Sequence, residues 1–101
     1  MKLIRTLAMA TMVCASSAWA SADLAKQKNC MACHGVDTKL VGPAFKAVAD
    51  KNRKDPGAEA RLATKIVKGG GGVWGPVPMP ANANVSEAEA KALARWILSL
   101  K

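Results

Sequence analysis

The sequence predicts an all-α protein that forms a single domain. Apolar residues recur at helical spacing, as Leu93, Trp96, Ile97 and Leu100 do at i, i+3, i+4 and i+7. Clusters of glycine and proline separate the helical segments, and no window alternates apolar with polar residues as a half-buried strand does. A length of 101 residues allows one domain and excludes a multidomain enzyme.

The first twenty residues have the composition of a secretory signal peptide. Lys2 and Arg5 precede an apolar stretch at 7–15, and Ala18-Trp19-Ala20 then offers small residues at the positions that signal peptidase recognises. The apolar stretch is shorter than the roughly 20 residues of a membrane-spanning helix. We therefore expect residues 1–20 to be a signal peptide, and no stable membrane insertion after its cleavage.

Cleavage after Ala20 leaves a domain of residues 21–101, and Ala20-Ser21-Ala22 makes cleavage after residue 22 an alternative. Loss of Lys2 and Arg5 lowers the formal charge of +8 by two, so the domain remains basic. Its apolar content comes largely from alanine, which buries little surface. Domains of this size commonly need a disulfide, a metal or a cofactor to complete the core. We expect such a group in the centre of this domain.

The first predicted helix covers 23–34, where helix breakers are few. The segment 35–43 contains Gly-Pro and other turn residues and is expected to be a loop. Pro43 suits the first turn of a second helix that extends to about Asn52, with Phe45 and Val48 on one face.

A third helix is expected at 58–68 and ends at the four glycines of 69–72. The segment 73–84 holds several prolines and is expected to be an irregular but stiff loop. The last helix has the clearest start, because Ser86 followed three residues later by Glu89 forms a capping box.

The sequence Cys30-Met31-Ala32-Cys33-His34 is the attachment motif of c-type haem. The two thiols can form thioethers with two vinyl groups on one porphyrin edge, and His34 can then ligate the iron from the proximal side. A thioredoxin-like dithiol would need a β-α-β context that is missing. A structural zinc site usually needs four ligands, and the domain offers two Cys and one His. A disulfide across this spacing would close a loop too small to stabilise much.

Met79 is the main candidate for the second axial ligand of the iron. His34 is the sole histidine, and Met31 lies inside the attachment loop, from which it cannot reach the opposite face. Met79 stands between Pro78 and Pro80 on the stiff loop, and this rigidity would hold a weak thioether ligand in place against water. The alternatives are that Met79 fills the core, as methionine often does, and that a lysine or an open site takes its place.

Three segments resemble the small bacterial class I cytochromes c of the cytochrome c-551 type. They are the attachment motif, Lys39-Leu40-Val41-Gly42-Pro43-Ala44-Phe45 and Gly72-Val73-Trp74-Gly75-Pro76-Val77-Pro78-Met79-Pro80. The resemblance covers nearly all of the domain. It implies a fold of about four helices wrapped around one covalently bound haem.

The resemblance also implies roles for individual residues. Cys30 and Cys33 would form the thioethers, with His34 and Met79 as the axial ligands. The Pro43 carbonyl would accept a hydrogen bond from the histidine ring, Trp74 and Lys65 would bind a haem propionate, and Asn82 would donate near the methionine sulfur. The sequence departs from the family at Lys65, where arginine is frequent, at Asn52, where an aromatic is common, and around Asn84, where the chain is one residue longer.

These features predict a monomeric periplasmic electron carrier and not an enzyme. A His/Met-ligated haem has no open coordination position for peroxide or oxygen, and its potential suits a respiratory carrier. By resemblance, a quinol-oxidising complex would donate electrons, and a terminal oxidase or a nitrite reductase would accept them. The alternatives are a dedicated haem subunit of a periplasmic dehydrogenase and a small peroxidase. Nucleic-acid binding is not expected, because no basic stripe is interleaved with aromatic residues.

Overall fold

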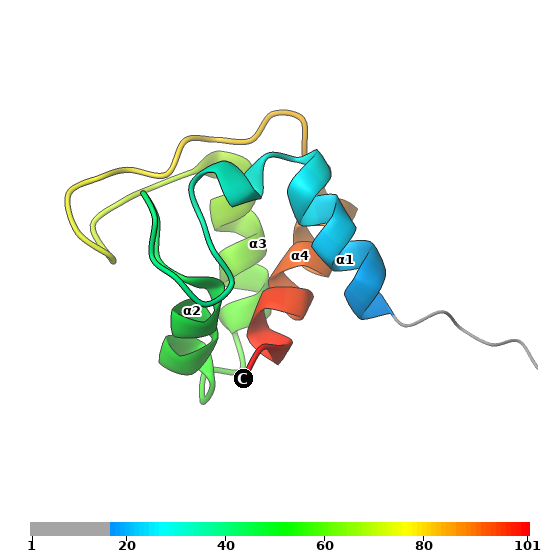
Figure 1. The fold of residues 1–101 in the computed structure, drawn as a ribbon, viewed down its shortest axis with the longest axis horizontal. Coiled ribbons are helices and arrows are strands. Elements are labelled where there is room, and N and C mark those ends of the chain that lie inside the picture. Colours follow the sequence, from blue (N-terminus) through cyan, green and yellow to red (C-terminus); the bar gives the residue numbers. More distant parts are fainter. Residues whose placement is uncertain (1–16) are drawn as a thin grey trace, which may run out of the picture.

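The computed structural model describes residues 17–101, with side chains from Ser21 onwards. Most of the predicted signal peptide, 1–16, lies outside them. The described helices, shown in Figure 1, are α1 (Ser17–Gln27), the 3₁₀-helix η1 (Cys30–Ala32), α2 (Phe45–Asn52), α3 (Ala58–Lys68) and α4 (Glu87–Ser99). Within this part of the chain β-pairing is limited to two isolated bridges, so the all-α prediction is confirmed. None of these helices is long and apolar enough to cross a membrane.

Helix α4 is the centre of the packing, because it contacts α1, α2 and α3. Its predicted apolar stripe faces inward: Leu93 is almost fully buried and Ile97 is 7% exposed. Leu93 belongs to one buried cluster, between α1, α3 and α4, and Ile97 joins a second one with Phe45 and Val48 of α2. Trp96 packs against both clusters. The C-terminal helix therefore joins the rest of the molecule together.

The first helix ends earlier than the sequence predicted. The expected helix at 23–34 stops at Gln27, and the chain then turns through Asn29, whose φ of 62° lies in the left-handed region. Asparagine tolerates this conformation better than other non-glycine residues. The turn allows η1 to begin at Cys30, so the attachment motif lies on a separate short helix and the loop after it.

Helix α2 begins at Phe45, two residues after the predicted start at Pro43, because Ala44 is extended with ψ of 140°. Its other end carries Asn52, at the position where the resemblance implies an aromatic residue. The Asn52 amide donates to the Val48 carbonyl at 2.7 Å, and its oxygen accepts a hydrogen bond from Arg61 of α3. Arg61 also pairs with Asp55. This polar network fixes the corner between α2 and α3.

Helix α3 has the predicted limits, and Gly69 ends it with φ of 73°. A Cβ at this position would lie 2.6 Å from the Met79 carbonyl oxygen, so only glycine fits. The capping box predicted for α4 is confirmed: the Ser86 hydroxyl accepts from the Glu89 N–H at 3.1 Å, and Glu89 Oε1 accepts from the Ser86 N–H at 3.0 Å.

Candidate functional site

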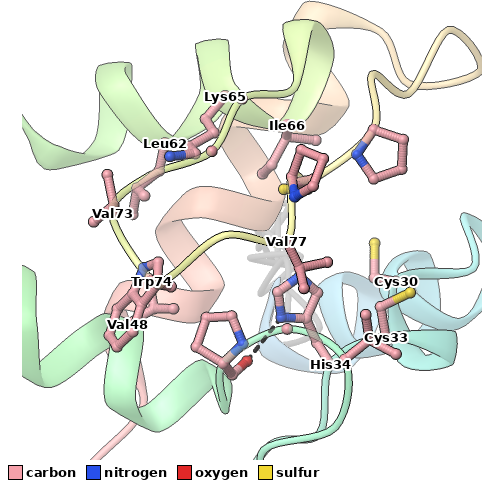
Figure 2. A pocket seen from close by; sticks show the side chains of 18 of the residues that line it. Cys30, Cys33, His34, Val48, Leu62, Lys65, Ile66, Val73, Trp74 and Val77 are labelled. Carbon is pink, nitrogen blue, oxygen red and sulfur yellow. Dashed lines mark hydrogen bonds between the residues drawn. The ribbon is translucent and has the colours of Figure 1, made fainter.

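A large apolar cavity lies between the helices and the two long loops. The space between its lining residues, including the part that is open to solvent, is about 1020 Å³. Figure 2 shows Cys30, Cys33 and His34 along one side and Leu62, Lys65 and Ile66 of α3 along the opposite side. Val73, Trp74 and Val77 of the loop after α3 also line it.

Both thiols of the attachment motif line this cavity and are free and half-buried. Burial raises the pKa of the Cys30 thiol, while a backbone hydrogen bond acts in the opposite direction. Among the described residues no three His, Cys, Asp or Glu side chains come together as a metal-binding group would require. Both cysteines line the cavity and could react with a group bound inside it.

The His34 imidazole is fixed by three neighbours. Its Nδ1 lies 2.7 Å from the Pro43 carbonyl oxygen, and because a carbonyl can only accept, Nδ1 carries the proton. Phe45 stacks on the ring with centroids 4.8 Å apart and planes 19° from parallel. The Gly42 backbone comes so close that a Cβ there would lie 2.6 Å from Cε1. The arrangement leaves Nε2 with a lone pair available to a metal.

Met79 also lines the cavity, and it packs against the buried cluster that contains Ile66 and Leu93. Its backbone is paired with Gly70 by two hydrogen bonds: the Met79 N–H donates to the Gly70 carbonyl at 2.7 Å, and the Gly70 N–H donates back at 3.0 Å. These bonds join the two ends of the loop that begins after α3. They set the depth at which the methionine enters the cavity.

The remaining predicted site residues fall into two groups. Trp74, Lys65 and Pro43 line the cavity, as the resemblance implies for residues near the haem. Asn82 is not among the lining residues. Its Nδ2 donates to the Ile66 carbonyl at 2.8 Å and its N–H to the Val67 carbonyl at 3.2 Å, so it fastens the chain after Met79 to α3.

Three residues near the site were not singled out from the sequence for these contacts. Gly42 and Phe45 contact the His34 ring, and the Lys51 ammonium lies 5.4 Å from the centre of the Trp74 ring. The sequence does contain Gly42-Pro43, eight and nine residues after His34, which indicates a turn but not the ring that the turn approaches. Contacts of this kind depend on how the loops fold back on the helices.

The donor set of the cavity suits a covalently attached haem. Two thiols three residues apart, an imidazole nitrogen with a free lone pair and a thioether share one apolar cavity, whose other lining residues include Val48, Leu62 and Ile97. Apolar surroundings and a controlled set of axial donors are the means by which proteins tune haem iron. Fold and site together define a small helical protein of the c-type haem class.

Comparison with known proteins agrees with this class. Residues 20–101 match the family Cytochrome c. Cytochrome c-552 of Nitrosomonas europaea is 55% identical over 95% of this chain and 93% of its own length, and cytochrome c-551 of Pseudomonas aeruginosa is 54% identical over 98% and 95%. The crystal structure of the wild-type Nitrosomonas europaea cytochrome c552 matches with a TM-score of 0.78 and 60% identity, covering 79% of this chain and 99% of that one.

The chain belongs to the cytochrome c family, and its relatives are class I monohaem cytochromes. Its fold is the cytochrome c fold. The cofactor is haem c, for which Cys30 and Cys33 stand in the attachment spacing, and the general function is electron transfer.

Proposed function

We propose that this protein is a periplasmic one-electron carrier in which His34 and Met79 are the two axial ligands of the haem iron. One observation carries the ligand assignment: both side chains line the cavity that also contains the two thiols, although they come from loops 45 residues apart in the sequence. When bound, haem c supplies an iron that gains and loses a single electron. The surrounding residues decide how that iron is held.

The chain supports this role by positioning its two ligands. Pro43 and Phe45 fix the tautomer and the orientation of the His34 ring, so Nε2 is presented without a change of conformation. The pairing with Gly70 and the flanking prolines do the same for Met79. With both axial positions filled, peroxide or oxygen has no coordination site, and we therefore propose a carrier and not an enzyme.

Polar residues around the cavity are proposed to complete the cofactor site. Trp74 and Lys65 line the cavity and would bind a propionate, the lysine through a single ammonium where the family often has the forked guanidinium of arginine. Asn82 is proposed to approach the methionine sulfur. Its amide is bonded to the Ile66 carbonyl, and this bond would hold it beside Met79.

We propose that the mature protein is exported to the periplasm and begins after residue 20 or 22. The alignment supports this proposal, because the family match begins at residue 20 and the solved Nitrosomonas chain is covered almost completely by only 79% of this chain. The carrier would act as a monomer between a quinol-oxidising complex and a terminal oxidase or nitrite reductase. A large subunit that co-purifies stoichiometrically would instead favour the dehydrogenase subunit.

The substitution Met79→Leu tests the ligand assignment, with Met31→Leu as the matched control. Met31 is also a partly buried methionine, but it packs against the core and does not line the cavity. We expect Met79→Leu to abolish the far-red sulfur-to-iron charge-transfer band of the ferric protein and to lower the reduction potential. Met31→Leu should keep both. A Met79→Leu protein with the parent band and potential would refute ligation by Met79.

A further inference from the structure

The loop that carries Met79 is attached to the molecule mainly at its base. Residues 71–78 are all exposed, and in the described part of the chain no hydrogen bond or ion pair joins them to another residue. The Gly70–Met79 pair fastens the two ends. Figure 1 shows the loop (yellow) extending away from the end of α3, with its tip turned toward α2. Within the polypeptide, only side-chain contacts can therefore hold the tip of this loop against the helices.

Lys51 is placed to hold it. Its ammonium lies 5.4 Å from the centre of the Trp74 ring, within the roughly 6 Å at which a cation is attracted to the face of an indole. Tryptophan is the best aromatic partner for a cation because its ring has the largest negative face. Lys51 is exposed and has no carboxylate partner among the described residues, so its charge is available to Trp74.

The end of α2 that carries Lys51 is itself well fixed. Phe45, Val48 and Ala49 bury the inner face of the helix. Next to Lys51, Asn52 is bonded to the Val48 carbonyl and to Arg61 of α3. A lysine on this rigid corner can therefore act as an anchor for a loop that has few contacts of its own.

We propose that Lys51 is a positioning residue that acts through Trp74 to keep the 71–78 loop closed over the cavity and thereby retards dissociation of Met79 from the iron. The effect on Met79 rests on the proposed His/Met ligation, but the closure of the loop does not. Trp74 both lines the cavity and lies under the Lys51 ammonium, so it connects the corner of α2 to the ligand loop.

The test uses the haem-loaded protein and three lysine variants. Lys51→Met keeps the apolar stem and removes the cation, Lys51→Arg restores a cation, and Lys54→Met removes an exposed charge three residues away that has no aromatic partner. Two quantities are measured in each: hydrogen exchange of the Gly70 and Met79 amides, whose mutual hydrogen bonds close the base of the loop, and the rate at which added imidazole displaces Met79 from the ferric iron.

We expect Lys51→Met to accelerate both processes by about five-fold, the size that loss of an exposed cation–π contact implies. Lys51→Arg should restore both to near the parent values, and Lys54→Met should change neither. In a Trp74→Leu background Lys51→Met should have no further effect, because its partner is already absent. This non-additivity would distinguish loss of the Lys51–Trp74 contact from a general loss of positive charge.

Unchanged exchange of the Gly70 and Met79 amides in Lys51→Met would overturn the proposal, as would an equal acceleration in Lys54→Met. Faster exchange with an unchanged displacement rate would overturn the part that concerns Met79. If Met79→Leu shows that Met79 is not a ligand, the proposed ligation fails, but the exchange measurement still decides whether Lys51 closes the loop.

Discussion

At the scale of single residues, the His34 ring is held more tightly than a solvent-exposed ligand would be. The Pro43 carbonyl sets the protonated nitrogen, Phe45 sets the plane of the ring, and Gly42 leaves just enough room beside Cε1. Each neighbour fixes a different degree of freedom. Because all three lie on the segment 42–45, a small shift of this segment would move the ligand.

We expect Gly42→Ala to displace the His34 ring. The added Cβ would lie 2.6 Å from Cε1 and 2.9 Å from Nδ1, so either the ring or the loop must move. Overpacking of this kind typically costs about 1–3 kcal/mol. Denaturant unfolding of the haem-loaded protein measures the cost, and the absorption spectrum and potential report the ring. Gly57→Ala is the control, because its Cβ would meet only Asp55 Oδ1 at 3.4 Å; an equal spectral change in both variants would contradict this account.

The sequence indicated the chemistry of the site better than its geometry. Cys30, Cys33, His34 and Met79 could be named because chemistry restricts which residues can attach or ligate haem, and all four do line one cavity. The contacts of Gly42 and Lys51 could not be predicted, because they arise only when a loop folds back on a ring or a helix. Neither contact has a fixed spacing in the sequence.

At the scale of elements, local signals decided which predictions were right. The limits of α3 and the start of α4 follow from glycines and a capping box, which act within a few residues. The predicted end of the first helix was wrong, because nothing in the sequence indicated that Asn29 would adopt the left-handed conformation that ends it. The predicted start of α2 was also wrong. Ala44 is extended, so the helix begins at Phe45, and the Pro43 carbonyl is free to accept a hydrogen bond from His34.

The two halves of the α4 capping box should be separable by pH. Ser86→Ala removes the hydroxyl that accepts from the Glu89 N–H, and loss of an N-cap typically costs about 1 kcal/mol. Most of this cost should remain at acid pH, since the hydroxyl does not titrate; only the smaller part by which the hydroxyl lowers the pKa of Glu89 should be lost there. The haem spectrum should not change, and a change would show that this helix start approaches the haem.

Glu89→Gln should behave differently. The Ser86 backbone N–H, and more weakly the charge of Lys28, lower the pKa of Glu89 below 4.5. A lowered folded-state pKa contributes stability that is present above the unfolded-state pKa and is lost as the pH falls through the folded-state value. Glu89→Gln should therefore destabilise the protein at pH 7 and lose that effect in acid, once the pH has fallen through the folded-state pKa of Glu89. Unfolding curves at both pH values measure this, and a cost that persists at low pH would show that the charge is not responsible.

At the scale of the whole molecule, the protein carries excess positive charge and exposes apolar side chains beside the cavity. Five of the seven carboxylates are paired with basic residues, so the remaining lysines carry the excess charge. Among residues 21–101 five large apolar side chains are exposed, all on the loops beside the cavity: Leu40, Val41, Val73, Trp74 and Val77. Met31, which lies between the two cysteines, is only partly exposed and packs against the core.

An apolar centre with a charged rim should divide electron transfer into two effects. Rim charges raise the rate of encounter with an acidic partner. Salt weakens this attraction, because the screening length is about 8 Å at physiological ionic strength. The apolar centre governs the close approach that tunnelling requires. Val77 is 61% exposed, so a substitution there tests the apolar centre directly. Lys39 lines the groove beside Val77, so a substitution there tests the charged rim.

We expect Val77→Glu to slow electron transfer to an acidic redox partner at every salt concentration, because it places a desolvated charge in the contact. Lys39→Gln should slow it mainly at low salt. Ala88→Glu is the control: it changes the net charge by the same amount as Val77→Glu, but on the exposed first turn of α4, so its effect should disappear as salt rises. Stopped-flow rates as a function of ionic strength distinguish the three. If Val77→Glu left the rate unchanged while loss of the rim lysines abolished transfer, the contact would lie away from the cavity mouth, and the exposed valines would have no part in it.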